Sequence, residues 1–65
     1  MNTLKEYRES KGVKQLAVAE HIGVSRATYA KYEDNQESMS IGQAKAVCEF
    51  LGCSMNDIFL LRNVN

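Results

Sequence analysis

Basic and short polar side chains between Lys14 and Lys31 are of the types that contact nucleic acid. Arg26 offers paired N–H groups that fit the acceptors of guanine in the major groove, and Lys31 lies farther along the chain. Ala27 suits a thymine methyl group, and the Thr28 hydroxyl suits a base or a phosphate. Base contacts are therefore predicted for Arg26, Ala27, Thr28 and Lys31. Lys31 also suits a contact with the DNA backbone. The alternative is that these are ordinary solvated residues of a surface helix.

A second group consists of polar side chains near expected helix starts and turns. Such residues reach phosphate oxygens through the side chain or through the backbone N–H groups at a helix N-terminus. Phosphate contacts are predicted for Lys14, Gln15, Ser25, Asn35 and Ser40. For Ser25 and Ser40 the alternative is a helix cap alone, although capping does not exclude phosphate contact.

Two helical patterns separated by a glycine must position these residues. The first runs over about 14–22 and the second over about 26–33. In the turn, Gly23 can take positive φ, Val24 can fill the angle between the helices, and Ser25 can cap the second helix. This spacing is the sequence form of a helix-turn-helix, whose second helix enters the DNA major groove.

Three further helices are predicted, over about 3–12, 40–52 and 55–61, giving an all-α fold. The expected caps and stops are Thr3 with Glu6, Gly12, Ser40, Gly52, and Ser54 with Asp57. The residues expected to face the core are Leu4, Tyr7, Val18, Ala19, Ile22, Tyr29, Tyr32, Glu33, Ile41, Ala44, Val47, Cys48 and Leu51. On the helix over 26–33, the side opposite Tyr29, Tyr32 and Glu33 is expected to carry Arg26, Ala27, Ala30 and Lys31. The whole chain, 1–65, is expected to form one compact five-helix domain.

The segment 34–39 is predicted to be an acidic loop that carries Asp34 and Glu37. Within it, Asn35 can adopt the left-handed conformation that glycine usually supplies. Close to DNA the two carboxylates would be repelled by phosphate, which argues against tight binding by a monomer.

Composition excludes several classes of protein. The chain has 65 residues and a formal net charge of zero, which weakens nonspecific attraction to nucleic acid. Cys48 and Cys53 are too few for a disulfide framework, and His21 is too distant to complete a zinc site, so reduced thiols and no metal or cofactor are expected.

No catalytic Ser, His and Asp set or phosphate-binding glycine loop is present, so no enzyme is expected. The polar N-terminus and the lack of a long apolar run predict a cytoplasmic protein without a membrane span.

Over nearly its whole length the chain resembles the Cro and lambda-type (XRE-like) repressor family of five-helix DNA-binding domains. The residues that carry the resemblance are Arg8, Gln15, Ala19, Gly23-Val24-Ser25, Lys31-Tyr32-Glu33, Leu51-Gly52 and Ser54. The resemblance implies an ion pair between Arg8 and Glu33, and it implies that Gln15 touches a phosphate and buttresses the recognition helix. The chain departs from the family at Lys14, where Ser or Thr usually caps the helix, and after Glu33, where basic residues are usual.

Two functions fit these observations. One is a sequence-specific DNA-binding regulator of the Cro type, a homodimer that occludes promoter DNA at an inverted repeat. The other is a phage antirepressor or modulator that uses the same scaffold to bind a partner repressor and block its DNA face. Arg26, Lys31 and Gln15 favour the first, whereas the zero net charge and the acidic segment 34–39 favour the second.

The C-terminal end carries three consecutive apolar residues, Phe59, Leu60 and Leu61. At 100° per residue they cannot all point into one small core, so at least one is expected to face outward. These three residues are therefore predicted to form the dimer contact.

Overall fold

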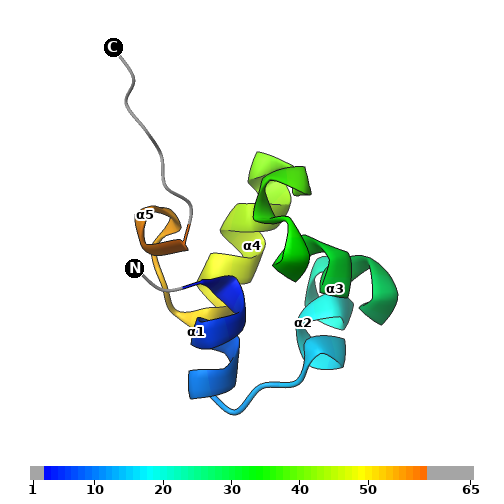
Figure 1. Cartoon of the computed structure of the whole chain (residues 1–65), viewed down its shortest axis with the longest axis horizontal. Helices are drawn as coiled ribbons and strands as arrows, with labels where there is room; N and C mark the ends of the chain where they lie inside the picture. Colours follow the sequence, from blue (N-terminus) through cyan, green and yellow to red (C-terminus); the bar gives the residue numbers. More distant parts are fainter. Residues whose placement is uncertain (1–2, 59–65) are drawn as a thin grey trace.

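A computed structural model describes residues 3–58, which form five α-helices and a short 3-10 helix, without strands in that range. The elements are α1 (Leu4–Ser10), α2 (Gln15–Ile22), α3 (Arg26–Asp34), η1 (Gln36–Ser38), α4 (Ile41–Leu51) and α5 (Met55–Ile58). The helices surround one core, and α2 packs against both α3 and α4 (Figure 1). The predicted all-α, five-helix fold is confirmed. None of these helices is long and apolar enough to span a membrane.

Reciprocal caps start three of the helices. At α1, Thr3 Oγ1 accepts from the backbone N–H of Glu6 at 3.1 Å, and Glu6 Oε1 accepts from the backbone N–H of Thr3 at 2.8 Å. These bonds satisfy N–H groups that a helix leaves unpaired in its first turn. The same reciprocal arrangement joins Ser40 with Gln43 and Ser54 with Asp57.

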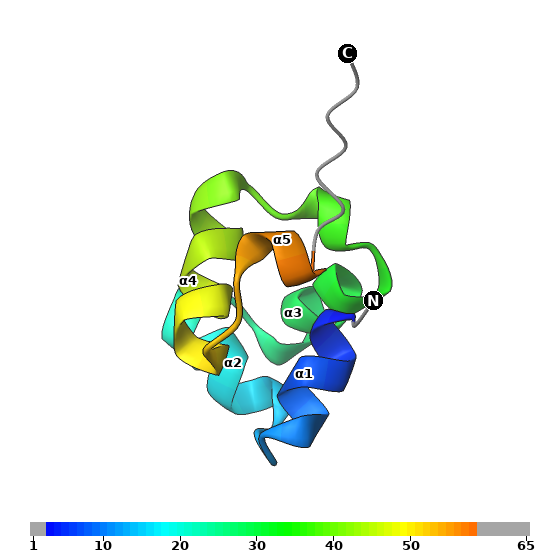
Figure 2. The ribbon, with the colours of Figure 1, turned by 90° about the vertical axis from the view of Figure 1, so that its left-hand side faces the viewer.

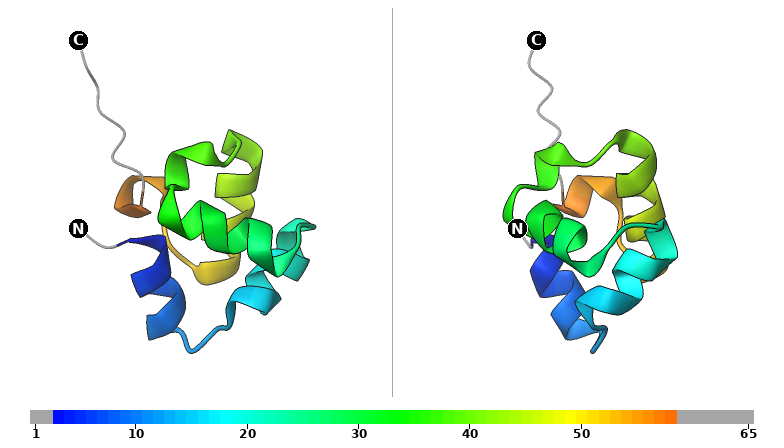
Figure 3. Two further views of the ribbon diagram at one scale, coloured as in Figure 1. Left: turned by 45° about the vertical axis from the view of Figure 1, so that its right-hand side comes forward. Right: turned by 90° about the vertical axis from the view of Figure 1, so that its right-hand side faces the viewer.

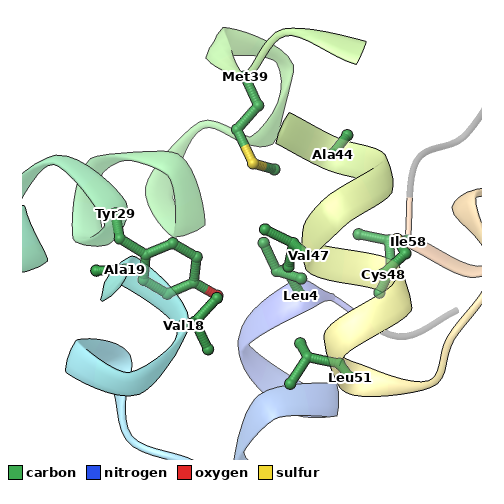
Figure 4. Close-up of a cluster of buried hydrophobic side chains, with 10 residues drawn as sticks. All are labelled: Leu4, Val18, Ala19, Tyr29, Met39, Ala44, Val47, Cys48, Leu51 and Ile58. Atoms are coloured by element: carbon green, nitrogen blue, oxygen red, sulfur yellow. The ribbon is translucent and has the colours of Figure 1, made fainter. Parts of the chain in front are cut away.

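All five helices contribute to the core (Figure 4). Its buried members are Leu4, Val18, Ala19, Tyr29, Met39, Ala44, Val47, Cys48, Leu51 and Ile58. The prediction that Ile41 faces the core is wrong, because its side chain is 74% exposed. Ile41 is the first residue of α4, at the N-terminal end of the helix. Met39, which precedes the capping residue Ser40, is buried instead.

The segment predicted to be an acidic loop is largely helical. The last residue of α3 is Asp34, and 36–38 form η1. The prediction of a left-handed Asn35 is wrong, because its φ is −141°. Among the described residues, positive φ occurs only at three glycines.

Gln36 explains why this segment is ordered. Its Oε1 accepts from the backbone N–H of Leu4 at 2.7 Å, and its Nε2 donates to the carbonyl of Ile58 at 3.2 Å. One amide therefore joins η1 to the start of α1 and to the end of α5. Figure 2 views the molecule from this side, with α5 between α4 and the α1 and α3 helices.

Candidate nucleic-acid interface

The turn between α2 and α3 has the geometry expected from its residues. Gly23 adopts φ 82°, and the N–H groups of Gly23 and Val24 both donate to the carbonyl of Ala19, at 2.9 and 3.0 Å. The Val24 side chain packs against the core. Ser25 Oγ accepts from the backbone N–H of Thr28 at 3.1 Å and so caps α3. The roles predicted for these turn residues are confirmed.

Helix α3 lies on the outside of the molecule, and one face remains free (Figure 3). Tyr29 is fully buried, and only 3% of the Glu33 side chain is exposed. Of the predicted base-contacting residues, Arg26, Ala27 and Lys31 are exposed, whereas Thr28 is half-buried. The helix therefore presents three of its four predicted base-contacting residues openly to solvent.

Arg8 and Glu33 form the ion pair that the family resemblance implied. Arg8 Nε donates to Glu33 Oε2 at 2.5 Å, and Arg8 Nη2 donates to Glu33 Oε1 at 3.2 Å. The side chains are only 10% and 3% exposed. Arg8 Nη1 also donates to the carbonyl of Val13 at 2.9 Å, which ties down the connection between α1 and α2. This buried pair fixes α3 to the rest of the fold.

Gln15 extends this network to the free surface. Its Nε2 donates to Glu33 Oε1 at 2.9 Å, while its Oε1 accepts from Arg26 Nη1 at 3.2 Å. Gln15 thus supports α3, as the resemblance implied, and the second N–H of its amide remains available to another acceptor. Its predicted phosphate contact stays a prediction.

The same two bonds correct the expected placement of Arg26. It does not lie opposite Glu33, because one Gln15 side chain reaches both residues. Seven residues make about two helical turns, so the two positions share a side of α3. Arg26 is nevertheless exposed, since it stands at the first turn of the helix, whereas Glu33 lies against α1.

Burial and hydrogen bonding act in opposite directions on the Glu33 carboxyl. Burial alone would raise its pKa, but the hydrogen bonds from Arg8 and Gln15 outweigh burial, so the pKa lies below its usual range. The hydrogen bond to Glu33 likewise raises the pKa of Arg8. Both groups are therefore charged at neutral pH.

The hydroxyl group of Tyr29 is buried beside this network. Among the described residues it has no hydrogen-bond partner of suitable geometry. Burial, with the neighbouring Glu33 carboxylate, raises the pKa of Tyr29 far above its usual range. Because Tyr29 is fully buried, its ring belongs to the core, as its helical spacing predicted.

Most of the candidate phosphate contacts lie at the starts of three helices. Lys14 precedes α2 with φ −85° and ψ 155°, and its side chain makes no capping bond. Ser25 precedes α3 and Ser40 precedes α4, and both hydroxyls cap their helices. Asn35 is exposed just after α3. All four side chains are solvent-accessible, and their phosphate contacts stay predictions.

Two features of this region were not found from the sequence. Gln36, flanked by polar residues, gave no periodic or motif signal, yet it joins three elements. From the sequence His21 was considered as a zinc ligand, but its ring stacks on Phe50 of α4 with centroids 4.4 Å apart and planes at 23°. The predicted dimer residues Phe59, Leu60 and Leu61 lie outside the described residues.

The comparison with known protein families agrees with this geometry. A helix-turn-helix family model matches residues 4–58. The match includes α2, the turn and α3, together with the flanking helices. No curated protein matches the chain.

Proposed function

The chain belongs to the lambda-repressor-type helix-turn-helix family of DNA-binding transcription regulators, and we propose that it is a sequence-specific repressor of the Cro type. In this proposal α3 lies in the major groove, and bound protein occludes promoter DNA. Arg26 contacts a guanine, and Ala27, Thr28 and Lys31 contact neighbouring bases or the backbone.

One observation carries this proposal: Arg26, the candidate for base contact at the start of α3, is held by the same hydrogen-bond network that fixes this helix to the fold. Arg26 is bonded to Gln15, and Gln15 is bonded to the buried Glu33. A side chain held in place before binding loses less conformational freedom when it meets a base. The bond of Arg26 to a neutral amide leaves its positive charge uncompensated and able to attract DNA.

The helix starts supply the proposed contacts with phosphate. The N-terminus of a helix directs N–H groups outward and favours negative charge. In the proposal the phosphate contacts come from Lys14, Gln15, Ser25 and Ser40 at helix starts, and from the Asn35 side chain directly after α3. These contacts set the register of α3 in the groove, while the base contacts provide sequence preference.

The proposed active form is a symmetric homodimer on an inverted repeat. Two-fold symmetry would place two α3 helices about one DNA turn, roughly 34 Å, apart. The proposed contact uses Phe59, Leu60 and Leu61. Sedimentation of the wild type and Leu60→Glu at micromolar concentration tests it: a dimer that the substitution converts to a monomer supports the contact, and monomers in both samples exclude it.

The central experiment is a fluorescence titration of the protein against the DNA upstream of its own coding sequence, at two salt concentrations. Arg26→Ala should weaken specific binding by about 1–3 kcal/mol and relax one base position. Lys5→Ala is the matched control, since it removes one exposed positive charge from α1, a helix that carries none of the predicted DNA contacts. If Arg26→Ala binds as tightly as the wild type, Arg26 does not read the operator.

A second candidate function is supported by the exposed carboxylates of Asp34 and Glu37, directly after α3. These acidic side chains suit the basic DNA-binding face of a partner repressor, which an antirepressor or modulator would block. Asp34→Arg combined with Glu37→Lys distinguishes the two functions. A DNA-binding repressor should bind DNA more tightly and with steeper salt dependence after this change. An antirepressor should instead lose its partner.

A further inference from the structure

Two cysteines lie close together in the sequence and in the fold, where α4 ends and before α5 begins. Cys48 lies in the last turn of α4 and is 3% exposed, whereas Cys53 is partly exposed and packs against the core. Between them, Gly52 adopts φ 76°. The N–H groups of Gly52 and Cys53 both donate to the carbonyl of Cys48, at 2.8 and 3.0 Å. In helix ends of this kind, the side chains at these two positions commonly contact each other.

The backbone bond limits how far apart the cysteines can be. With the nitrogen of Cys53 3.0 Å from the oxygen of Cys48, standard bond lengths keep the two Cα atoms within about 7 Å. Disulfides usually span Cα distances of about 4.4–6.8 Å. The Cα separation of the pair is therefore compatible with a disulfide.

The surroundings of the two thiols differ. Burial, together with the neighbouring Cys53 thiol, raises the pKa of Cys48 to about 12. Cys48 is consequently protonated and shielded from solvent, whereas Cys53 is reachable from outside. An oxidant from solution would meet Cys53 first.

We propose that Cys48 and Cys53 are an oxidation site, which a peroxide converts into a reversible intramolecular disulfide. In the first step the Cys53 thiol loses its proton and its sulfur attacks one peroxide oxygen, the O–O bond breaks, Cys53 becomes a sulfenic acid, and the departing hydroxide takes up a proton to form water. The Cys48 thiol then gives its proton to the hydroxyl group of the sulfenic acid as its sulfur attacks the Cys53 sulfur, so the S–S bond forms, the S–O bond breaks, and water leaves. In total, two thiols are oxidised and one hydrogen peroxide is reduced to two waters.

The disulfide would restrain the connection between α4 and α5 and would not move the residues proposed to contact DNA. The cysteines are at the C-terminal end of α4, whereas Ser40, the one proposed phosphate contact beside this helix, caps its N-terminal end. The bond closes a short loop that includes Gly52 and fixes the approach to α5. We expect a higher midpoint of thermal unfolding for the oxidised protein and no change in half-site DNA affinity.

The test treats the reduced full-length chain with hydrogen peroxide, labels the remaining thiols with iodoacetamide after denaturation, and maps the peptides by mass. The expected product has lost two hydrogen atoms, takes up no label, contains a peptide linked through Cys48 and Cys53, and regains both thiols with dithiothreitol. Cys53→Ser is the matched control, because position 53 is partly exposed and serine preserves its size. In this variant Cys48 should remain a labelled thiol.

Two results would overturn the proposal. One is a Cys53 sulfinic or sulfonic acid beside a Cys48 that still takes the label, which would show that the thiols do not react with each other. The other is a disulfide that links two chains. A comparison of the thermal unfolding midpoints of the oxidised and reduced wild type is an independent check of the Cys48–Cys53 disulfide, and it requires no substitution.

Discussion

Nε2 of Gln15 donates a 2.9 Å hydrogen bond to Oε1 of Glu33, so the first residue of α2 is fastened to the next-to-last residue of α3. Since the other end of the same amide accepts from Arg26, α3 is held near both of its ends by one side chain. Glu33 in turn is bonded to Arg8 of α1. The orientation of the proposed recognition helix therefore depends on a polar network as well as on apolar packing.

The Arg8–Glu33 pair should stabilise the fold as a unit. Arg8→Met should cost about 3 kcal/mol or more, because it leaves the buried Glu33 carboxylate without its cation. Adding Glu33→Leu should recover much of this loss, although Gln15 and the Val13 carbonyl would still lack partners. Urea unfolding of the wild type, both single variants and the double variant measures the coupling. Additive losses would contradict an interaction.

Stability should depend on pH through Glu33. The folded-state pKa of Glu33 lies below the ordinary carboxyl value of 4.5, so the stability that the Glu33 charge contributes is fully present above that value. It should be lost as the pH falls from about 4.5 through the folded-state pKa, because protonation removes the charge that Arg8 compensates. Unfolding free energies from pH 7 to pH 3 measure this loss. Glu33→Gln should flatten the curve in that window, and an equally steep curve in this variant would assign the effect to other carboxylates.

Lys14→Ser should make the fold more stable. Lys14 already has the extended backbone of an N-cap but provides no capping oxygen, and a serine there should add about 1 kcal/mol. Lys14→Ala is the matched control, since it removes the same charge without supplying a cap. If Lys14 contacts phosphate, both variants should bind DNA more weakly, with a salt slope smaller by about one. A stability gain shared by both variants would show that charge, not capping, is responsible.

Gln36→Leu should destabilise the fold by about 2 kcal/mol, because it leaves the N–H of Leu4 and the carbonyl of Ile58 without this partner. Gln36→Glu keeps the acceptor for Leu4 but removes the donor to Ile58, so its loss should be smaller. Chemical denaturation gives both values. Equal stability of wild type and Gln36→Leu would mean that water replaces the amide at no cost.

Tyr29→Phe should leave the unfolding free energy unchanged or raise it by up to about 1 kcal/mol, because the hydroxyl is buried without a partner among the described residues. Thermal and urea unfolding of the variant measure the change. A loss of stability would show that the hydroxyl is bonded in solution, to Glu33 or to a buried water.

The local features of this protein were determined by the sequence alone. Caps such as Thr3 and glycine stops such as Gly52 act over three to five residues, so their chemistry is readable from neighbouring positions. The helix-turn-helix was predictable for the same reason, since Gly23 and Ser25 fix the turn locally. Apolar spacing also identified most of the core.

Tertiary structure alone decided which polar side chains meet across the fold. The contacts of Gln15 with Arg26 and of Gln36 with Ile58 join residues 11 and 22 positions apart, and no periodic pattern encodes such pairs. The position of the connection between α3 and α4 likewise decides that Met39 is buried, that Ile41 is exposed and that Asn35 has negative φ. Local propensity allows several conformations in such a segment, and long-range hydrogen bonds and packing select one of them.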